Sequence, residues 1–200
     1  MDKWTEAQTY EAKWHAKIGA NTFNEERKQF VYAKKMGIEI YPTPETPFNI
    51  KNYGKVLDIG GGEVSMLLKV EKPEGCAVID PCDYPSWVVD RYTSKGIMFM
   101  NYKAEDIEVP KKKYDEYDEV WIYNCLQHVE NPEVICHKAL QTGKLVRVFE
   151  WIDLPICEGH IHTLTEKGLN KWLGGFGKVG RVDEDGCNGQ YYAGIFLGLN

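Results

Sequence analysis

The sequence lacks any uninterrupted apolar run near the roughly 18 residues that a membrane-spanning helix needs. Its first 15 residues are polar and have none of the apolar core that marks a secretory signal. These two absences predict a cytoplasmic protein without a membrane partner. The 200 residues suffice for one domain with a small appendage.

Paired cysteines and basic charge are also scarce. The six cysteines are scattered without a C-x-x-C pair, which in a cytosolic chain predicts free thiols. Cys157, His160 and His162 are residue types that zinc accepts, but no fourth ligand is evident, so we expect no metal site. The net charge is −6, and a lone run of three lysines at 111–113 gives no basic face. DNA or RNA is therefore not an expected partner.

Hydrophobic periodicity divides the chain into two parts. Residues 2–37 read as two helices, and a proline-rich connector follows. Downstream, the expected strands are 55–59, 76–80, 96–101, 119–124 and 144–152, and the expected helices are 64–70, 84–92, 132–140 and 165–174. This alternation predicts an α/β fold, a Rossmann-like doubly wound and mostly parallel sheet, closed by a C-terminal antiparallel hairpin. We expect helices and connector over 1–50 and the α/β domain over 51–200.

A glycine-rich turn follows the first expected strand. Gly60, Gly61 and Gly62 allow a tight turn there and let a ligand approach the backbone closely. Asp80 closes the second expected strand, where an acid can accept both hydroxyls of a ribose. The carboxyl ends of parallel strands meet at one edge of the sheet. The two features together therefore predict a site for an adenosine-containing ligand.

Residues 56–62 read V-L-D-I-G-G-G, which resembles the first motif of class I S-adenosylmethionine-dependent methyltransferases. That motif is an apolar pair, an acid, any residue and alternating glycines. Asp58 supplies the acid, and Val64 stands in place of the last glycine. The resemblance continues in order over about residues 54–197. Its further segments are an adenine-side segment at 104–107, a fourth motif at 117–129 and a segment after the fifth strand at 160–165.

The resemblance implies S-adenosylmethionine as the cofactor and a small molecule as the methyl acceptor. The implied cofactor-binding residues are Asp58, Gly60, Gly61, Gly62, Asp80, Ala104, Glu105, Asn124 and Leu126. It also implies an N-terminal helical lid, with the acceptor pocket formed by Tyr10, Trp14, His15 and Glu150. For the first three, an aromatic face that docks the helix on the core is an equal alternative.

Three histidines are the candidates for a general base, which is needed only where the acceptor must lose a proton. His128 follows the fourth expected strand, and His160 and His162 follow the fifth, so their loops should lie over the carboxyl-end crevice. An extended H-I-H segment would place both of its rings on one side. The alternative is a structural role, such as a helix cap or a solvated position.

Other functions remain open. A nicotinamide-dependent oxidoreductase would carry G-x-G-x-x-G, but Ser65 stands at its last glycine. A catalytically silent protein that retains the cofactor site is the second alternative, because Val64 and Lys103 depart from the family pattern. Methyltransferases that act on amino groups of nucleic-acid bases usually carry Asp/Asn-Pro-Pro-aromatic after the fourth strand. Segment 124–127 reads N-C-L-Q instead, which argues against a nucleic-acid acceptor. The sequence leaves the oligomeric state open.

Overall fold

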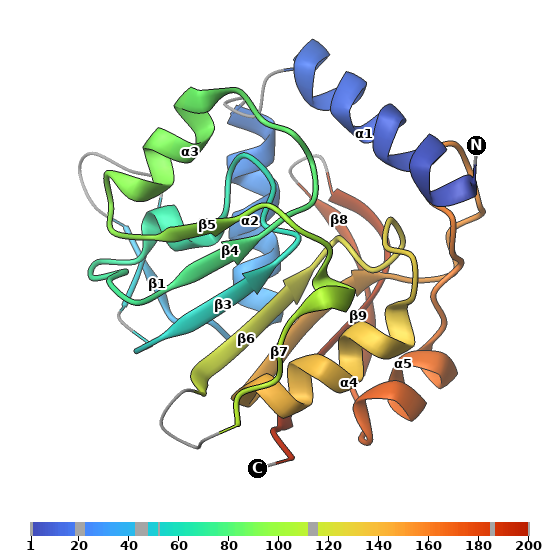
Figure 1. Ribbon diagram of the computed structural model, residues 1–200. Coiled ribbons are helices and arrows are strands. Elements are labelled where there is room, and N and C mark those ends of the chain that lie inside the picture. Colours follow the sequence, from blue (N-terminus) through green and yellow to red (C-terminus); the bar gives the residue numbers. More distant parts are fainter. Residues whose placement is uncertain are drawn as a thin grey trace.

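The structure is a computed structural model that describes residues 2–18, 23–42, 48–51, 53–111, 116–184 and 187–199, with the backbone alone for 14–18 and 23–26. A seven-stranded sheet forms its centre, in the order β5-β4-β3-β6-β7-β9-β8 (Figure 1). The parallel strands are β3 (Val56–Ile59), β4 (Ala77–Ile79), β5 (Met98–Met100), β6 (Tyr117–Tyr123) and β7 (Gly143–Trp151). An antiparallel pair, β8 (Lys178–Glu184) and β9 (Cys187–Leu197), completes the sheet. The predicted fold class is confirmed.

Helices cover both faces of the sheet (Figure 1). α2 (Phe23–Lys35) and α3 (Ser86–Thr93) lie on one face, and α4 (Pro132–Thr142) and α5 (Glu166–Leu173) lie on the other. Strand side chains alternate between the faces and build two separate cores. Trp121 and Phe149 belong to the core under α2, whereas Val120 and Val148 belong to the core under α4 and α5.

Local sequence sets the ends of the helices on the second face. Asn131 caps α4, since its side chain accepts a hydrogen bond from the Val134 N–H, and Pro132 occupies the first helical position. Thr165 caps α5 by accepting from the Gly168 N–H, and Gly174, in the left-handed region at φ 66°, ends it. Both helices therefore begin close to their predicted starts.

The predicted helix over 64–70 is wrong. A short 3-10 turn, η1 (Met66–Lys69), stands there, capped by Ser65. Val70 is drawn into a β-bridge with Ile50 of β2 (Asn49–Ile50), a strand that pairs with β1 (Ile40–Tyr41) in a second small sheet. The bridge requires an extended backbone, which ends the helical path after one turn.

The first two helices have different positions. α2 packs on the sheet, and its Val31, Ala33 and the following Met36 are buried in the core. α1 (Lys3–Ile18) lies instead across the loops at the carboxyl ends of the parallel strands (Figure 1). α1 is therefore the helix placed to cover a site at that edge. No helix in the described part of the chain is long and apolar enough to cross a membrane.

Candidate active site

A cavity of about 500 Å³ lies at the carboxyl ends of the parallel strands, where doubly wound folds bind their ligands. The glycine turn after β3, the end of β4 and the loops after β6 and β7 line it. α1 contributes Trp4, Gln8, Tyr10 and Glu11 to its wall, and α2 contributes Lys28, Gln29 and Tyr32. Its volume is in the range of sites for small ligands and cofactors.

The glycine turn depends on its glycines. Gly60 and Gly62 have φ values of 74° and 61°, which disfavour other residues. A Cβ at Gly60 would lie 2.5 Å from the Cβ of Cys125, and one at Gly61 would lie 2.9 Å from Oδ2 of Asp58. The turn therefore packs closely on the strands beneath it while its backbone lines the cavity.

Asp58 lies beneath the turn and is absent from the cavity wall. Its Oδ2 accepts hydrogen bonds from the hydroxyls of Ser65 and Tyr123, each at 2.5 Å. Burial raises the pKa of this carboxyl to about 7. The sequence predicts Asp58 as a cofactor ligand, whereas its contacts in the structure fix the path of the turn.

Two backbone N–H groups that follow the glycine turn are hydrogen-bonded within the protein, so they are not free for a ligand. Ser65 N–H donates to the hydroxyl of Tyr92 at 2.8 Å, and Met66 N–H donates to that of Tyr123 at 3.1 Å. The Tyr92 hydroxyl in turn donates to the Gly62 carbonyl at 2.7 Å. These two tyrosines were missed from sequence. For Tyr123 a signal existed, because strand alternation places it on the same face as Asp58.

Asp80 lines the cavity at the end of β4. Its Oδ2 accepts from the Gly62 N–H at 3.0 Å. Its Oδ1 accepts from the Cys82 N–H at 3.0 Å and from the Tyr84 hydroxyl at 3.1 Å. The carboxylate thus joins the glycine turn to β4 and remains part of the cavity surface, where hydroxyls of a ligand can reach it.

Most other predicted cofactor residues also line the cavity. Ala104 and Glu105, in η2 (Ala104–Asp106), form one side, and Oε1 of Glu105 accepts from the Asn131 N–H at 2.8 Å. Asn124 lines the cavity at the end of β6, in the left-handed region at φ 51°. Leu126 does not line it, because its side chain is fully buried in the core under α4.

Glu150 is the predicted pocket residue that lies elsewhere. Its neighbours Phe149 and Trp151 face α2, so Glu150 points to the opposite face. There its Oε1 accepts from the N–H groups of Cys125 and Leu126, at 3.1 Å each. The carboxyl is fully buried, which raises its pKa to about 7. Glu150 therefore holds the loop after β6 from below.

The three candidate histidines separate in the structure. His128 and His160 line the cavity, with their rings edge to face and their centroids 4.8 Å apart. His162 does not line it, since its Nε2 lies 2.9 Å from the Val129 carbonyl and fixes that loop. Burial and the nearby His128 lower the pKa of His160. The expected pair of rings on one side of the H-I-H segment is thus replaced by a pair from two loops.

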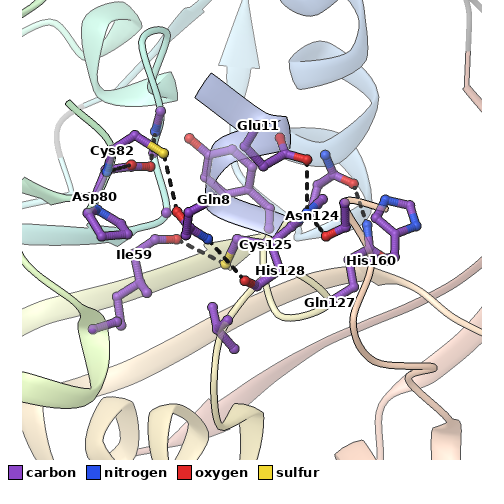
Figure 2. A pocket seen from close by; sticks show the side chains of 18 of the residues that line it. Gln8, Glu11, Ile59, Asp80, Cys82, Asn124, Cys125, Gln127, His128 and His160 are labelled. Carbon is purple, nitrogen blue, oxygen red and sulfur yellow. Dashed lines mark hydrogen bonds and ion pairs between the residues drawn. The ribbon is translucent and has the colours of Figure 1, made fainter. Parts of the chain in front are cut away.

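α1 contacts the loops after several strands. Gln8 accepts from the thiol of Cys82 at 3.3 Å and donates to the His128 carbonyl at 3.2 Å (Figure 2). Oε1 of Glu11 lies 3.3 Å from Nδ1 of His128, and Nζ of Lys103 lies 3.8 Å from the Trp4 ring. Of the predicted pocket residues on this helix, Tyr10 lines the cavity. The side chains of Trp14 and His15 lie outside the described residues.

The cysteine–histidine segment gives no metal centre. Among the described residues, no group of three or more His, Cys, Asp or Glu side chains is arranged to hold a metal ion. Cys157 is exposed and unbridged, and the ring of His162 is occupied by a backbone carbonyl.

No protein-family model matches the sequence, and no curated protein is significantly similar to it. Solved structures are similar in fold. A 1,6-didemethyltoxoflavin-N1-methyltransferase from Burkholderia thailandensis, with S-adenosylhomocysteine bound, matches with a TM-score of 0.63 and 12% identity over 97% of this chain and 87% of that chain. A magnesium protoporphyrin IX methyltransferase from Synechocystis PCC 6803, with S-adenosylmethionine bound, matches with a TM-score of 0.62 and 13% identity over 98% of each chain. The chain has the class I methyltransferase fold.

The methyltransferase fold does not by itself decide the reaction. The [4+2]-cyclase SpnF matches this chain with a TM-score of 0.55 and 15% identity, over 78% of this chain and 57% of its own. The reaction therefore depends on the residues that line the cavity.

Proposed function

We propose that this protein is an S-adenosylmethionine-dependent methyltransferase that acts on a small-molecule acceptor. The observation that carries the proposal is Asp80, a cavity-lining carboxylate hydrogen-bonded to the glycine turn at Gly62. This arrangement suits an adenosine ligand, since the acid can accept ribose hydroxyls while the glycines admit the ligand close to the backbone. The bound cofactors of the similar solved structures support this choice.

Each part of the cofactor has a suitable surface. Ile79 and Ala104 line the cavity with apolar surface that could contact the adenine, and the backbone of the glycine turn could contact the amino-acid portion. The sulfonium already activates the methyl group, so the protein mainly has to position the acceptor in line with the S–CH3 bond. Tyr10, Trp151 and Leu154 form an aromatic and apolar surface for that acceptor.

The proposed lid is α1 alone, because α2 is built into the core. A cavity of about 500 Å³ that α1 partly covers favours a small molecule over a polymer. The solved neighbours named for methylating a toxoflavin precursor and a magnesium porphyrin support the same class of acceptor. The cytoplasmic location and the absence of a nucleic-acid partner stay predictions from the sequence.

Asp80→Asn tests the cofactor assignment. The change keeps the size of the side chain but removes its charge, so S-adenosylhomocysteine should bind about 10- to 150-fold more weakly, the worth of a charge-assisted hydrogen bond. Titration calorimetry measures this effect, and urea unfolding checks the fold, because Asp80 also holds Gly62 and Cys82. Asp83→Asn is the matched control, since Asp83 is exposed nearby and does not line the cavity.

Three results would contradict the proposal. Unchanged affinity in a folded Asp80→Asn protein would remove the ribose assignment. Heat on titration with NAD, and none with S-adenosylhomocysteine, would favour the oxidoreductase. Tight cofactor binding without methyl transfer from labelled S-adenosylmethionine to cell-extract metabolites would favour the silent binding protein.

A further inference from the structure

We propose that Glu11 and His128 form a carboxylate–imidazole pair that acts as the general base, and that α1 completes this base when it covers the cavity. The inference rests on the proposed methyltransferase function and narrows its acceptors. It implies an acceptor that loses a proton on methylation, namely a hydroxyl or an N–H group.

The hydrogen bonds of His128 fix which nitrogen carries its proton. Nδ1 lies 2.9 Å from the Gly159 carbonyl oxygen and 3.3 Å from Oε1 of Glu11 (Figure 2). Both partners are acceptors at this position, so Nδ1 must donate. The unprotonated nitrogen of the neutral ring is then Nε2, which has no hydrogen-bond partner among the described residues. An acid on the Nδ1–H side is the arrangement that orients a general base and stabilises its imidazolium.

His160 lacks this arrangement. None of the described side chains donates to or accepts from its ring, and its contact with His128 is edge to face. Burial and the nearby His128 lower its pKa, whereas the pKa of His128 is raised, so His160 is the weaker proton acceptor of the two. We therefore assign His160 to the wall of the acceptor pocket and the proton transfer to His128.

Charged or polar groups from three parts of the chain act on the pKa of His128. Burial lowers its pKa, but Glu11 on α1, the Gly159 carbonyl and Glu150 on β7 raise it, with a net shift above the ordinary value. His160 lies on the remaining side. Glu11 is the largest of the contributions that raise the pKa. Removing its charge should therefore lower the pKa of His128.

α1 holds His128 at two points. Gln8 donates to the His128 backbone carbonyl, and Glu11, three residues further along the helix and on the same face, bonds its ring. The other hydrogen-bond partner of the ring, the Gly159 carbonyl, comes from the loop after β7, and Glu150 on β7 acts on the ring only through its charge. Withdrawal of α1 would remove the carboxylate and leave the imidazole in place. The base is thus complete only with the helix over the cavity.

The proton balance defines the acceptor. As the oxygen or nitrogen of the acceptor bonds to the methyl carbon, the carbon–sulfur bond breaks and its electron pair stays on sulfur. The acceptor's proton moves to Nε2 of His128, and the imidazolium later returns it to solvent. A tertiary amine or a thioether has no proton to lose, so it gains nothing from this pair.

Glu11→Gln tests the pair, with Glu6→Gln as the matched control on the exposed side of the same helix. In protein saturated with S-adenosylhomocysteine, NMR titration of the imidazole Cε1–H should show a lower pKa for His128 in Glu11→Gln and no change in the control. Methyl transfer to a panel of phenols, N–H heteroaromatics, tertiary amines and thioethers measures activity. We expect transfer to the first two classes, with kcat about 10²-fold lower in Glu11→Gln. The acid limb of its pH profile should move to lower pH.

The outcomes separate the two proposals. Failure of the unaltered protein to bind S-adenosylhomocysteine overturns the methyltransferase function and the pair with it. Cofactor binding with an unchanged His128 pKa, or with unchanged kcat, in Glu11→Gln overturns the pair alone, as does transfer only to tertiary amines or thioethers. Should Glu11→Gln fail to fold, Glu11→Ala serves instead. It removes the carboxylate altogether, and an unchanged His128 pKa or an unchanged kcat in this variant would overturn the pair.

Discussion

Buried carboxylates in this molecule differ in their hydrogen-bond partners. Glu119 has a full set of partners, since Arg147 donates to its two oxygens at 2.7 and 2.9 Å and the indole N–H of Trp121 donates at 2.7 Å. Asp58 and Glu150 accept hydrogen bonds from neutral groups alone within the described part of the chain. One oxygen of each, Oδ1 and Oε2 respectively, has no partner there.

The carboxylate with a cation and the two carboxylates without one have different positions in the fold. Arg147 also donates to the carbonyls of Met36 and Gly37, so its pair with Glu119 fixes the end of α2 to the sheet. Asp58 and Glu150 instead lie under the glycine turn and the loop after β6, which line the cavity. Buried acids without a cation cost stability, and such groups gather at functional sites. Asp58 and Glu150 thus lie beneath the cavity without a compensating cation, whereas Glu119, away from the cavity, has one.

Arg147→Met should give the largest effect. The change leaves the charge of Glu119 buried without its cation, which costs about 3–5 kcal/mol of the free energy of unfolding. Urea denaturation measures the loss. Adding Glu119→Gln should restore part of it, because the orphaned charge is then gone. Lys144→Met is the control, since the pair of Lys144 with Asp118 is exposed and should contribute little to stability. If Arg147→Met loses no more stability than Lys144→Met, the buried pair of Arg147 with Glu119 does not stabilise the fold more than an exposed pair does.

The fold was largely predictable because its signals are local. Short apolar runs alternating with helical stretches marked the five parallel strands, and the glycine turn marked the first crossover. The exception is the helix expected over 64–70. It does not form because Val70 pairs in a β-bridge with Ile50, which is distant in the sequence. Tertiary pairing overrides a helical pattern of only seven residues, which has little intrinsic stability.

The sequence located most of the residues that line the candidate site, but it did not show how each side chain is oriented. Asp80 and the glycines follow from strand ends, which sequence patterns locate. The burial of Asp58 and Glu150 depends on which face each strand position takes once the sheet forms, and a motif does not report this. Glu11 carries no signal at all, because its partner is 117 positions away and an acid on a polar helix is usually solvated.

The raised pKa values of Asp58 and Glu150 should make the stability of the protein depend on pH. The pKa values of Asp58 and Glu150 are about 7 in the folded state and near 4 when unfolded. Between about pH 4 and 7 the folded state binds more protons, so the free energy of unfolding falls as pH rises and levels off above 7. Asp58→Asn and Glu150→Gln should each flatten this slope, by about 1–3 kcal/mol over the window. Urea unfolding at several pH values measures it, and an unchanged slope in both variants would mean that these acids are compensated.

Gln8→Ala should change the free energy of global unfolding least, and its effect should be confined to α1. α1 is held at this point by two neutral hydrogen bonds, to Cys82 and to His128, whereas α2 is held by a charged guanidinium. Losing them should cost about 0.5–1.5 kcal/mol. Because α1 lies outside the two cores, this loss should appear as local opening of the helix.

Hydrogen exchange distinguishes local from global loss for this variant. Amides of α1 should exchange about 2- to 10-fold faster in Gln8→Ala, the rate equivalent of that free energy, while amides of α2 and β6 should keep their protection. Thr9→Ala is the control, because Thr9 is exposed and its hydroxyl bonds only the Thr5 carbonyl of its own helix. Equal acceleration across α1, α2 and β6 would show that α1 unfolds with the core. A helix coupled in that way could not open as a lid, and the base formed by Glu11 and His128 would then be permanent.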